Sequence, residues 1–327
     1  MLKIAMLSSW HVHALEYAQR FNEREDAVVT CVWDEEVEKG QAFADEIGVE
    51  FESDLDKLLA RADVDAVCVS APTNIHEMVM VKAAKAKKHI FTEKILAITL
   101  EECENIKRAI VENDVKFTIC FFHQALPHNL FAKKVIDEGM LGTITYFRVR
   151  NAHSGASDGW LPPHFYSKEQ CGGGAMIDLG AHPMYLINWL MGQPTEMASA
   201  FTHVTGQNVE DNAVSIMKYP NGAIAVSETG FVSSPSPFMM EIYGTCGALI
   251  IQGDKISLSS RKIDNKEYAG FITPAALPEK QKHPVAVFVD GVLKNEEMAY
   301  GIDEAIQLTK MMVAAYSAHE TNGFVNV

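Results

Sequence analysis

The first third of the chain alternates short apolar segments with segments of helical spacing. Apolar, β-branched runs predict buried strands, because a parallel strand covered on both faces has no polar side. The predicted strands are Lys3–Ser8, Ala27–Trp33, Ala66–Ala71, His89–Thr92 and Lys116–Phe121. The predicted helices between and after them are His13–Phe21, Glu36–Ile47, Asp54–Ala60, Ile75–Ala86 and Leu100–Asn113. This alternation predicts a doubly wound parallel sheet with right-handed crossovers.

The pattern changes after about residue 122. A helix is predicted at Pro127–Glu138, a long helical segment follows the glycines at 172–174, and Gly301–Ala318 reads as a closing helix. Between Thr195 and Leu258 several strands follow one another, and the Pro220-Asn221-Gly222 turn predicts a hairpin. We therefore expect an α/β domain over 1–121 and an α+β domain over 122–327 with an open, mostly antiparallel sheet.

Composition narrows the class of protein. The 327 residues suit two domains, and 48% hydrophobic with 22% charged residues is typical of globular chains. A net charge of −15 argues against a nucleic-acid or anionic-membrane partner, which would need a basic surface. We predict no membrane span and no signal peptide, because apolar runs are too short. Six scattered cysteines without a C-x-x-C pair predict reduced thiols in a cytoplasmic protein.

The ends of the predicted strands carry the candidate chemistry, since ligands of doubly wound sheets bind there. The loop Ser8-Ser9-Trp10-His11-Val12-His13 follows the first strand, where a dinucleotide fingerprint would place glycines. It contains none, although Ser8 and Ser9 are small enough for close approach. The alternative is a plain strand-to-helix turn that binds nothing.

Three further strand ends carry polar residues. Asp34, about 20 residues beyond the loop, suits the two hydroxyls of an adenosine ribose, or caps the next helix. In Ala71-Pro72-Thr73-Asn74-Ile75-His76, Thr73 or Asn74 can cap a helix while facing a ligand. Glu93-Lys94 is an acid–base pair after a strand; its alternative is an exposed ion pair of little energetic weight.

The second domain contributes Gly172-Gly173-Gly174 followed by Asp178 and His182. At i and i+4 we expect these two side chains on one helix face, continued by Tyr185. A carboxylate and an imidazole placed together can position a substrate hydroxyl and remove its proton. The alternative is a helix ion pair. Pro183 predicts a kink or restart of the helix.

Together these segments resemble the Gfo/Idh/MocA oxidoreductases, the family of glucose–fructose oxidoreductase and inositol dehydrogenase. The resemblance rests on the segments 65–76 and 88–94 and on the pattern Gly172-Gly173-Gly174-x-x-x-Asp178-x-Gly180-x-His182. It implies a Rossmann domain over 1–121, a substrate-binding and oligomerisation domain over 122–327, and an NAD(P)-dependent dehydrogenase acting on CH–OH groups of sugars or cyclitols.

The resemblance also implies roles for individual residues. Lys94 and His182 become the proton-handling pair, Asp178 a catalytic and substrate-binding residue, and Glu93 a neighbour of the nicotinamide. The full set of implied cofactor contacts is Ser8, Trp10, His11, Val12, Asp34, Ala71, Pro72, Thr73, Asn74, His76, Glu93 and Lys94. NAD is expected rather than NADP, because Asp34, Glu35 and Glu36 would repel a 2′-phosphate.

The chain departs from the family pattern at several positions. Ile95 replaces the usual proline after the Glu-Lys pair, Gln124 stands where an arginine is common, and Tyr185 replaces an acidic residue. The substrate side of the pocket is therefore this chain's own. Candidates to line it are His123, Trp160, His153 and His164, for each of which ordinary surface or core placement is an equal alternative.

Other functions stay open at this stage. A related enzyme could oxidise a sugar transiently, eliminate or epimerise at the next carbon and return the hydride to substrate, with NAD tightly held. A nucleotide-responsive regulator on the same fold is the non-catalytic alternative. A metal site on His11-Val12-His13 finds no third ligand by spacing, so we predict none. Apolar positions such as Ile224 and Val226 predict a homodimer or homotetramer that covers the open sheet.

Overall fold

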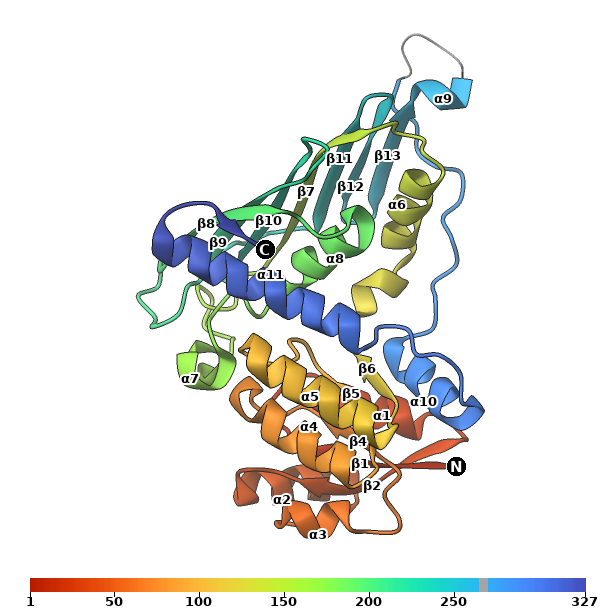
Figure 1. The fold of residues 1–327 in the computed structure, drawn as a ribbon, viewed down its shortest axis with the longest axis vertical. Coiled ribbons are helices and arrows are strands. Elements are labelled where there is room, and N and C mark those ends of the chain that lie inside the picture. The colour runs from red at the N-terminus through yellow and green to blue at the C-terminus, as the bar shows by residue number, and fades with distance from the viewer. Residues whose placement is uncertain (265–269) are drawn as a thin grey trace. The chain divides into compact units, whose positions relative to one another are not determined.

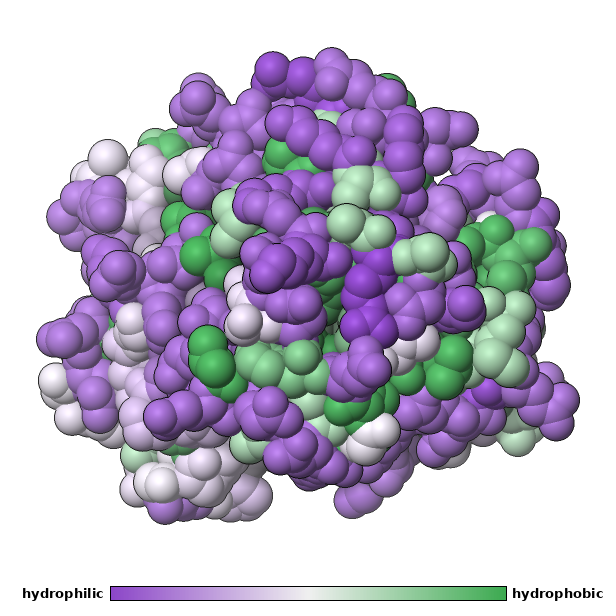
Figure 2. All heavy atoms as spheres, turned by 90° about the horizontal axis from the view of Figure 1, so that it is seen from below, coloured by the Kyte–Doolittle hydropathy of each residue, from purple (hydrophilic) through white to green (hydrophobic). Residues whose placement is uncertain are grey.

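The computed structural model describes residues 1–264 and 270–327 (Figure 1). They form two compact units. The first unit comprises Met1–Phe121 and Lys282–Thr309, and the second comprises Phe122–Gln281 and Lys310–Val327. Hydrophilic residues cover most of the face drawn in Figure 2, as the net charge of −15 leads one to expect. No helix in the described part of the chain has both the length and the apolar character needed to cross a bilayer.

A six-stranded parallel sheet forms the centre of the first unit, in the order β3-β2-β1-β4-β5-β6. The strands are β1 (Leu2–Leu7), β2 (Ala27–Trp33), β3 (Glu50–Phe51), β4 (Ala66–Val69), β5 (His89–Thr92) and β6 (Phe117–Ile119). Every residue of β4 is buried, which explains its unbroken apolar run. The predicted doubly wound parallel sheet is confirmed.

Helices connect these strands. They are α1 (Ala14–Asn22), α2 (Val37–Ile47), α3 (Leu55–Leu59), the 3-10 helix η1 (Thr73–Ile75), α4 (His76–Lys85), α5 (Leu100–Asn113) and, later in the chain, α10 (Pro284–Lys294). Local sequence sets their ends. Thr99 and Glu102 form a capping box at the start of α5, and Gly48, at φ 73°, ends α2 in the left-handed conformation.

Residues 282–309 belong to the first unit, whereas the sequence predicted one continuous second domain over 122–327. The segment joins the first unit because its aromatic side chain Phe288 packs in the core of that unit. The Phe288 ring of α10 lies 5.8 Å from that of Phe91 and 6.5 Å from that of Phe21, measured between centroids. Arg24 adds a 2.8 Å ion pair to Asp290. The returning segment therefore completes the core of the first unit.

An eight-stranded sheet forms the centre of the second unit, in the order β13-β12-β11-β7-β10-β9-β8-β14. Its strands are β7 (Ile144–Ala152), β8 (Glu196–Thr202), β9 (Asn212–Lys218), β10 (Ile224–Gly230), β11 (Met239–Gly244), β12 (Gly247–Gln252), β13 (Lys255–Ser260) and β14 (Val325–Asn326). All pairs are antiparallel except β10 with β7. The predicted mostly antiparallel sheet and its hairpin at 220–222 are confirmed.

Helices cover one face of this sheet (Figure 1). The helical segments are η2 (Phe122–Ala125), α6 (Pro127–Asp137), η3 (Pro163–Tyr166), α7 (Lys168–Cys171), α8 (Ala181–Met191), α9 (Arg261–Asp264) and α11 (Ile302–Thr321). Helix α8 packs on β7 and β10, and its buried residues include Met184, Leu186 and Ile187. The predicted closing helix is α11, within which the boundary between the units falls.

Candidate active site

The carboxyl edge of the parallel sheet collects the predicted cofactor residues of the first unit. Ser8 follows β1, Asp34 follows β2, Ala71 lies beyond β4, and Glu93 follows β5. Strands β1 and β4 are neighbours and lead to opposite halves of the sheet, so the switch point lies between them. Ligands of doubly wound folds bind at this point.

The loop after β1 contains no glycine, and hydrogen bonds hold its conformation. Ser8 has a φ of 73°, the left-handed conformation that glycine usually supplies. Its backbone N–H donates to the Trp33 carbonyl at 2.6 Å, and its Oγ accepts from the Trp10 N–H at 3.1 Å. Ser8 thus takes the conformation of a fingerprint glycine without being one.

Asp34 holds this loop in place. Its carboxylate accepts from the backbone N–H and the hydroxyl of Ser9, at 2.9 and 2.8 Å, and from the Glu36 N–H at 2.8 Å. Asp34 is buried, so these bonds account for much of its accepting capacity. Contact with an adenosine ribose stays a prediction.

Glu35 differs from its neighbour Asp34. Its Oε2 is buried with no hydrogen-bond partner among the described residues. Burial first, and then the charge of Asp34, raises the pKa of Glu35 from 4.5 to about 6. No pattern in the sequence singles out Glu35 for this property.

The helix after β4 begins in a different way from the prediction. Neither Thr73 nor Asn74 caps the next helix, because a 3-10 turn over these residues comes first and Ile75 occupies the N-cap position of α4 without a side-chain bond. His76 is buried, with one ring nitrogen 3.0 Å from the Ala71 carbonyl and the other near the carbonyls of residues 95 and 96. Its ring thus ties the segment after β4 to the segment after β5.

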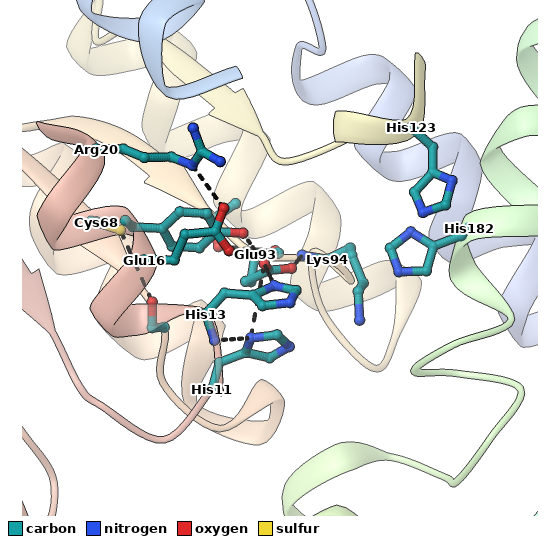
Figure 3. Close-up of polar contacts among 12 residues, drawn as sticks. His11, His13, Glu16, Arg20, Cys68, Glu93, Lys94, His123 and His182 are labelled. Atoms are coloured by element: carbon teal, nitrogen blue, oxygen red, sulfur yellow. Dashed lines mark hydrogen bonds and ion pairs between the residues drawn. The ribbon is translucent and has the colours of Figure 1, made fainter. Parts of the chain in front are cut away.

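Glu93 and Lys94 are both buried, which excludes the alternative of an exposed ion pair. Glu93 Oε1 lies 2.7 Å from His13 Nδ1 and 3.8 Å from His11 Nδ1, and it accepts from the Tyr17 hydroxyl (Figure 3). Its Oε2 accepts from the Lys94 N–H at 2.9 Å. The peptide between Lys94 and Ile95 is cis.

Electrostatics couple this carboxylate to the loop after β1. Burial alone would raise the pKa of Glu93, but His11 and His13 hold that pKa well below its ordinary value. For His13 the signs are reversed. Burial alone would lower its pKa, but the Glu93 charge raises that pKa above 6.5. Spacing had offered no third group to join the two histidines; the fold brings Glu93 to them across 80 residues of sequence.

The glycines of the second unit have a structural reason. The Gly174 N–H donates to both carboxylate oxygens of Glu210 at 3.0 Å, and the Met176 N–H donates to Oε1 at 2.9 Å. A Cβ on Gly174 would clash with the Glu210 carbonyl, and one on Gly173 with the Tyr316 hydroxyl. The absence of side chains at Gly173 and Gly174 therefore permits the close approach of Tyr316 and Glu210.

The predicted helix after these glycines begins later than expected. Helix α8 starts at Ala181, and Asp178 lies in the preceding turn, where its N–H donates to the Gly174 carbonyl at 3.1 Å. Asp178 and His182 therefore do not stand at i and i+4 on one helix. Pro183 lies in the first turn of α8, where its missing N–H costs nothing, so it causes no kink.

His182 belongs to a small polar cluster on α8 and η2. Its Nδ1 lies 3.0 Å from the Tyr185 hydroxyl, which also accepts from the His123 N–H at 3.3 Å. The rings of His123 and His182 lie 4.5 Å apart between centroids. His182 is buried, so this hydroxyl constrains its tautomer and orientation. The prediction that Tyr185 shares a face with His182 is met; its contact with His182 Nδ1 was not foreseen.

The other candidate substrate residues of the second unit make aromatic contacts of their own. Trp160 is 56% exposed, and its ring lies 4.7 Å from that of His153, which stacks on Phe231. His164 lies in η3 and contacts Phe165. Sequence reasoning missed Tyr17, Glu210 and Tyr316. The only signal for Tyr17 was its position one turn beyond His13; the contacts of Glu210 and Tyr316 had none.

A hollow of about 310 Å³ lies beside the loop after β1. Ser9, His11 and Val12 line it together with the start of α1, and α2 completes it with Lys39, Ala42, Phe43 and Glu46. A helix N-terminus suits an anionic group, because its first N–H groups have no partner within the helix. These residues fit the phosphate-bearing part of a dinucleotide.

Two family profiles match the chain. The oxidoreductase family with an NAD-binding Rossmann fold matches residues 11–121, and the GFO/IDH/MocA C-terminal domain matches residues 130–250. A 2,7-anhydro-N-acetylneuraminate hydratase of Mediterraneibacter gnavus is 30% identical over 249 residues, 72% of this chain and 63% of that protein. The scyllo-inositol 2-dehydrogenase (NAD⁺) of Bacillus subtilis is 28% identical over 69% of this chain and 66% of its own length.

Solved structures agree on the fold. A levoglucosan dehydrogenase in complex with NADH superposes with a TM-score of 0.85 at 20% identity, covering 100% of this chain and 99% of that one. The alignment with the first-named relative, the hydratase, spans less than two thirds of that protein's length. The profiles, by contrast, match both units in the expected order. The chain belongs to the Gfo/Idh/MocA oxidoreductase family, and its first unit is an NAD-binding Rossmann fold.

Proposed function

We propose that the protein transfers a hydride between NAD and a CH–OH carbon of a sugar, a sugar derivative or a cyclitol. The observation that carries the proposal is a buried lysine, Lys94, two residues beyond the end of β5 at the ligand-binding edge of an NAD-binding fold. The named activities of relatives support the substrate class: an inositol dehydrogenase and a 1,5-anhydro-D-fructose reductase of Ensifer adhaerens.

In this proposal NAD supplies only the acceptor carbon for the hydride, and the chain supplies the proton chemistry. His182 removes the proton of the substrate hydroxyl through Nε2, while Nδ1–H donates to the Tyr185 hydroxyl. The Lys94 ammonium stabilises the alkoxide that develops, and burial strengthens this charge effect. Asp178 binds a second substrate hydroxyl from the turn before α8.

The test is a screen of sugars, sugar acids and inositols with NAD, read by absorbance of the reduced cofactor. Lys94→Met and His182→Ala should each lower kcat by roughly 10²–10⁴-fold while NAD affinity changes by only a few-fold. Lys57→Met, at a position where the side chain is 72% exposed, is the matched control and should keep kcat. Near wild-type kcat in His182→Ala would remove His182 from its role as base.

A second candidate is a redox-neutral reaction in which the hydride returns to the substrate after elimination or epimerisation. It is favoured by the relatives from Mediterraneibacter gnavus and Escherichia coli that are named hydratases. The stoichiometry of NADH separates the two reactions. Net oxidation yields one NADH per product molecule, whereas the redox-neutral cycle accumulates none.

We also propose a preference for NAD over NADP. Asp34, Glu35 and Glu36 place carboxylates after β2, and these repel a 2′-phosphate. Lys39 lines the nearby hollow but is paired with Glu36 at 2.6 Å, which offsets its charge. Titration calorimetry with both cofactors tests the preference, and equal or tighter NADP binding would contradict it.

A homodimer or homotetramer in the cytoplasm is the remaining part of the proposal. The sheet face opposite α8 exposes Ile216, Ile224 and Tyr243 by 40, 42 and 36%, an apolar area that a second copy would cover. Light scattering that gives only the chain mass of 36.1 kDa at micromolar concentration would contradict this assembly. Buried thiols such as Cys68 and Cys103 suit a reducing compartment.

A further inference from the structure

Two imidazoles and a carboxylate meet at the carboxyl edge of the parallel sheet (Figure 3). His11 and His13 belong to the loop after β1, and Glu93 follows β5. One ligand atom from each lies within 4.8 Å of the other two. Across residues 1–264 and 270–327 this is the one group of three histidine, cysteine or acidic side chains that comes so close.

The distances between the three ligand atoms are close to those of a metal site. Ligands at about 2.0–2.2 Å from a tetrahedral zinc ion lie about 3.3–3.6 Å from one another. The separations of Glu93 Oε1 from the two Nδ1 atoms, 2.7 and 3.8 Å, bracket that spacing. To seat an ion between them, the shorter separation would have to widen by about 0.6–0.9 Å and the longer one to shorten slightly.

His11 and Glu93 each offer a lone pair for coordination. The Nδ1 of His11 accepts from the His13 backbone N–H at 3.2 Å, so it carries a lone pair. The Glu93 side chain is 3% exposed, and a buried carboxylate needs a compensating positive charge. The Tyr17 hydroxyl donates to the same carboxylate and orients it, as outer hydrogen bonds commonly orient metal ligands.

We infer that His11, His13 and Glu93 form a binding site for a divalent transition-metal ion that prefers nitrogen and oxygen ligands, of which Zn²⁺ is the representative. Three protein ligands leave one tetrahedral position open, as in zinc sites that bind a further oxygen donor. His13 is 32% exposed in its side chain, which gives the ion a path from solvent. Zinc binding at these three residues can be measured without substrate and without NAD, so its test does not depend on the proposed hydride transfer.

The experiment uses the full-length protein after removal of metals with a chelator and dialysis. Zinc chloride is titrated by calorimetry, and cobalt chloride is followed by visible absorption. We expect one equivalent of zinc to bind and cobalt to give the intense bands of a tetrahedral site. Absence of a stoichiometric zinc site in the wild-type protein would overturn the inference.

Variants assign the ligands. His13→Ala should weaken zinc binding by at least about 100-fold and abolish the cobalt bands, since it removes one of three ligands. Val12→Ala is the matched control, because Val12 lies between the histidines, is 52% exposed and offers no ligand atom. Wild-type zinc affinity in a folded His13→Ala protein would overturn the site. Glu93→Gln provides the same test for the carboxylate, with circular dichroism to verify the fold.

Discussion

Two buried glutamates, one in each unit, show how different donors give one residue type different properties. Glu93 is 3% and Glu210 is 4% exposed. Glu210 is held by the backbone N–H groups of Gly174 and Met176 and by the Tyr316 hydroxyl at 2.6 Å. Glu93 is held largely by side chains, among them the imidazoles of the loop after β1.

The two sets of donors differ in whether they can lose a proton or bind a metal ion. Backbone amides neither lose their protons near neutral pH nor bind cations, so the Glu210 contacts fix the turn before α8 and do little else. Imidazole nitrogens carry lone pairs and bind metals, so the contacts of Glu93 can be replaced by coordination. Glu210 is a structural element, and Glu93 is a candidate for chemistry.

The largest expected effect is the loss of the Glu210 carboxylate. Glu210→Ala would leave two amides and one hydroxyl buried without their acceptor, at about 1–3 kcal/mol each. We expect the free energy of unfolding to fall by about 4 kcal/mol, measured by urea denaturation. Glu196→Ala, which removes a half-exposed ion pair with Lys218, is the control and should cost less than about 1 kcal/mol. Equal losses in the two variants would show that Glu210 is not a structural element.

The second largest loss of stability is expected from a change at Gly174, which contacts Glu210. Gly174→Ala places a methyl group against the Glu210 carbonyl, and the backbone on both sides is fixed by hydrogen bonds. We expect a loss of about 3 kcal/mol, the upper range for overpacking a buried site. Gly323→Ala meets no atom closer than 3.8 Å and should change stability by less than about 1 kcal/mol. Thermal unfolding of the two variants makes the comparison.

Zinc should distinguish the two glutamates directly. A ligand that binds only the folded protein, present at about 100 times its dissociation constant, adds about 2.7 kcal/mol to the free energy of unfolding. We expect this gain in wild-type protein and in a folded Glu210→Gln variant, and no gain in His13→Ala. Stabilisation that persists in His13→Ala would place the ion elsewhere.

The smallest effect concerns Glu35, a carboxylate whose Oε2 is buried without a hydrogen-bond partner among the described residues. Its pKa is higher in the folded protein, about 6, than its ordinary 4.5, so the folded state binds more protons between these values. Stability should therefore fall as pH rises from 4.5 through 6, by no more than about 2 kcal/mol. Glu35→Gln should flatten this part of the pH profile and stabilise the protein at pH 7. An unchanged profile would contradict the raised pKa.

The sequence predicted the elements whose patterns are local. Buried parallel strands leave unbroken apolar runs, so β2 and β5 were predicted with the bounds that the structure has. Parallel strands end at one edge, so the polar residues that follow them could be grouped from the order of the strands alone. Helix spacing after the glycines was less informative, because the turn that delays α8 to Ala181 depends on Glu210, which is distant in sequence.

Only the tertiary structure decided which distant side chains meet. Residues 282–309 join the first unit because Phe288 completes an aromatic core with Phe21 and Phe91. Glu93 reaches His11 and His13 because β5 and β1 both flank β4 in the sheet. Sequence spacing determines neighbours within a helix or a strand. Neighbours across a sheet depend on strand order, which results from packing the whole chain.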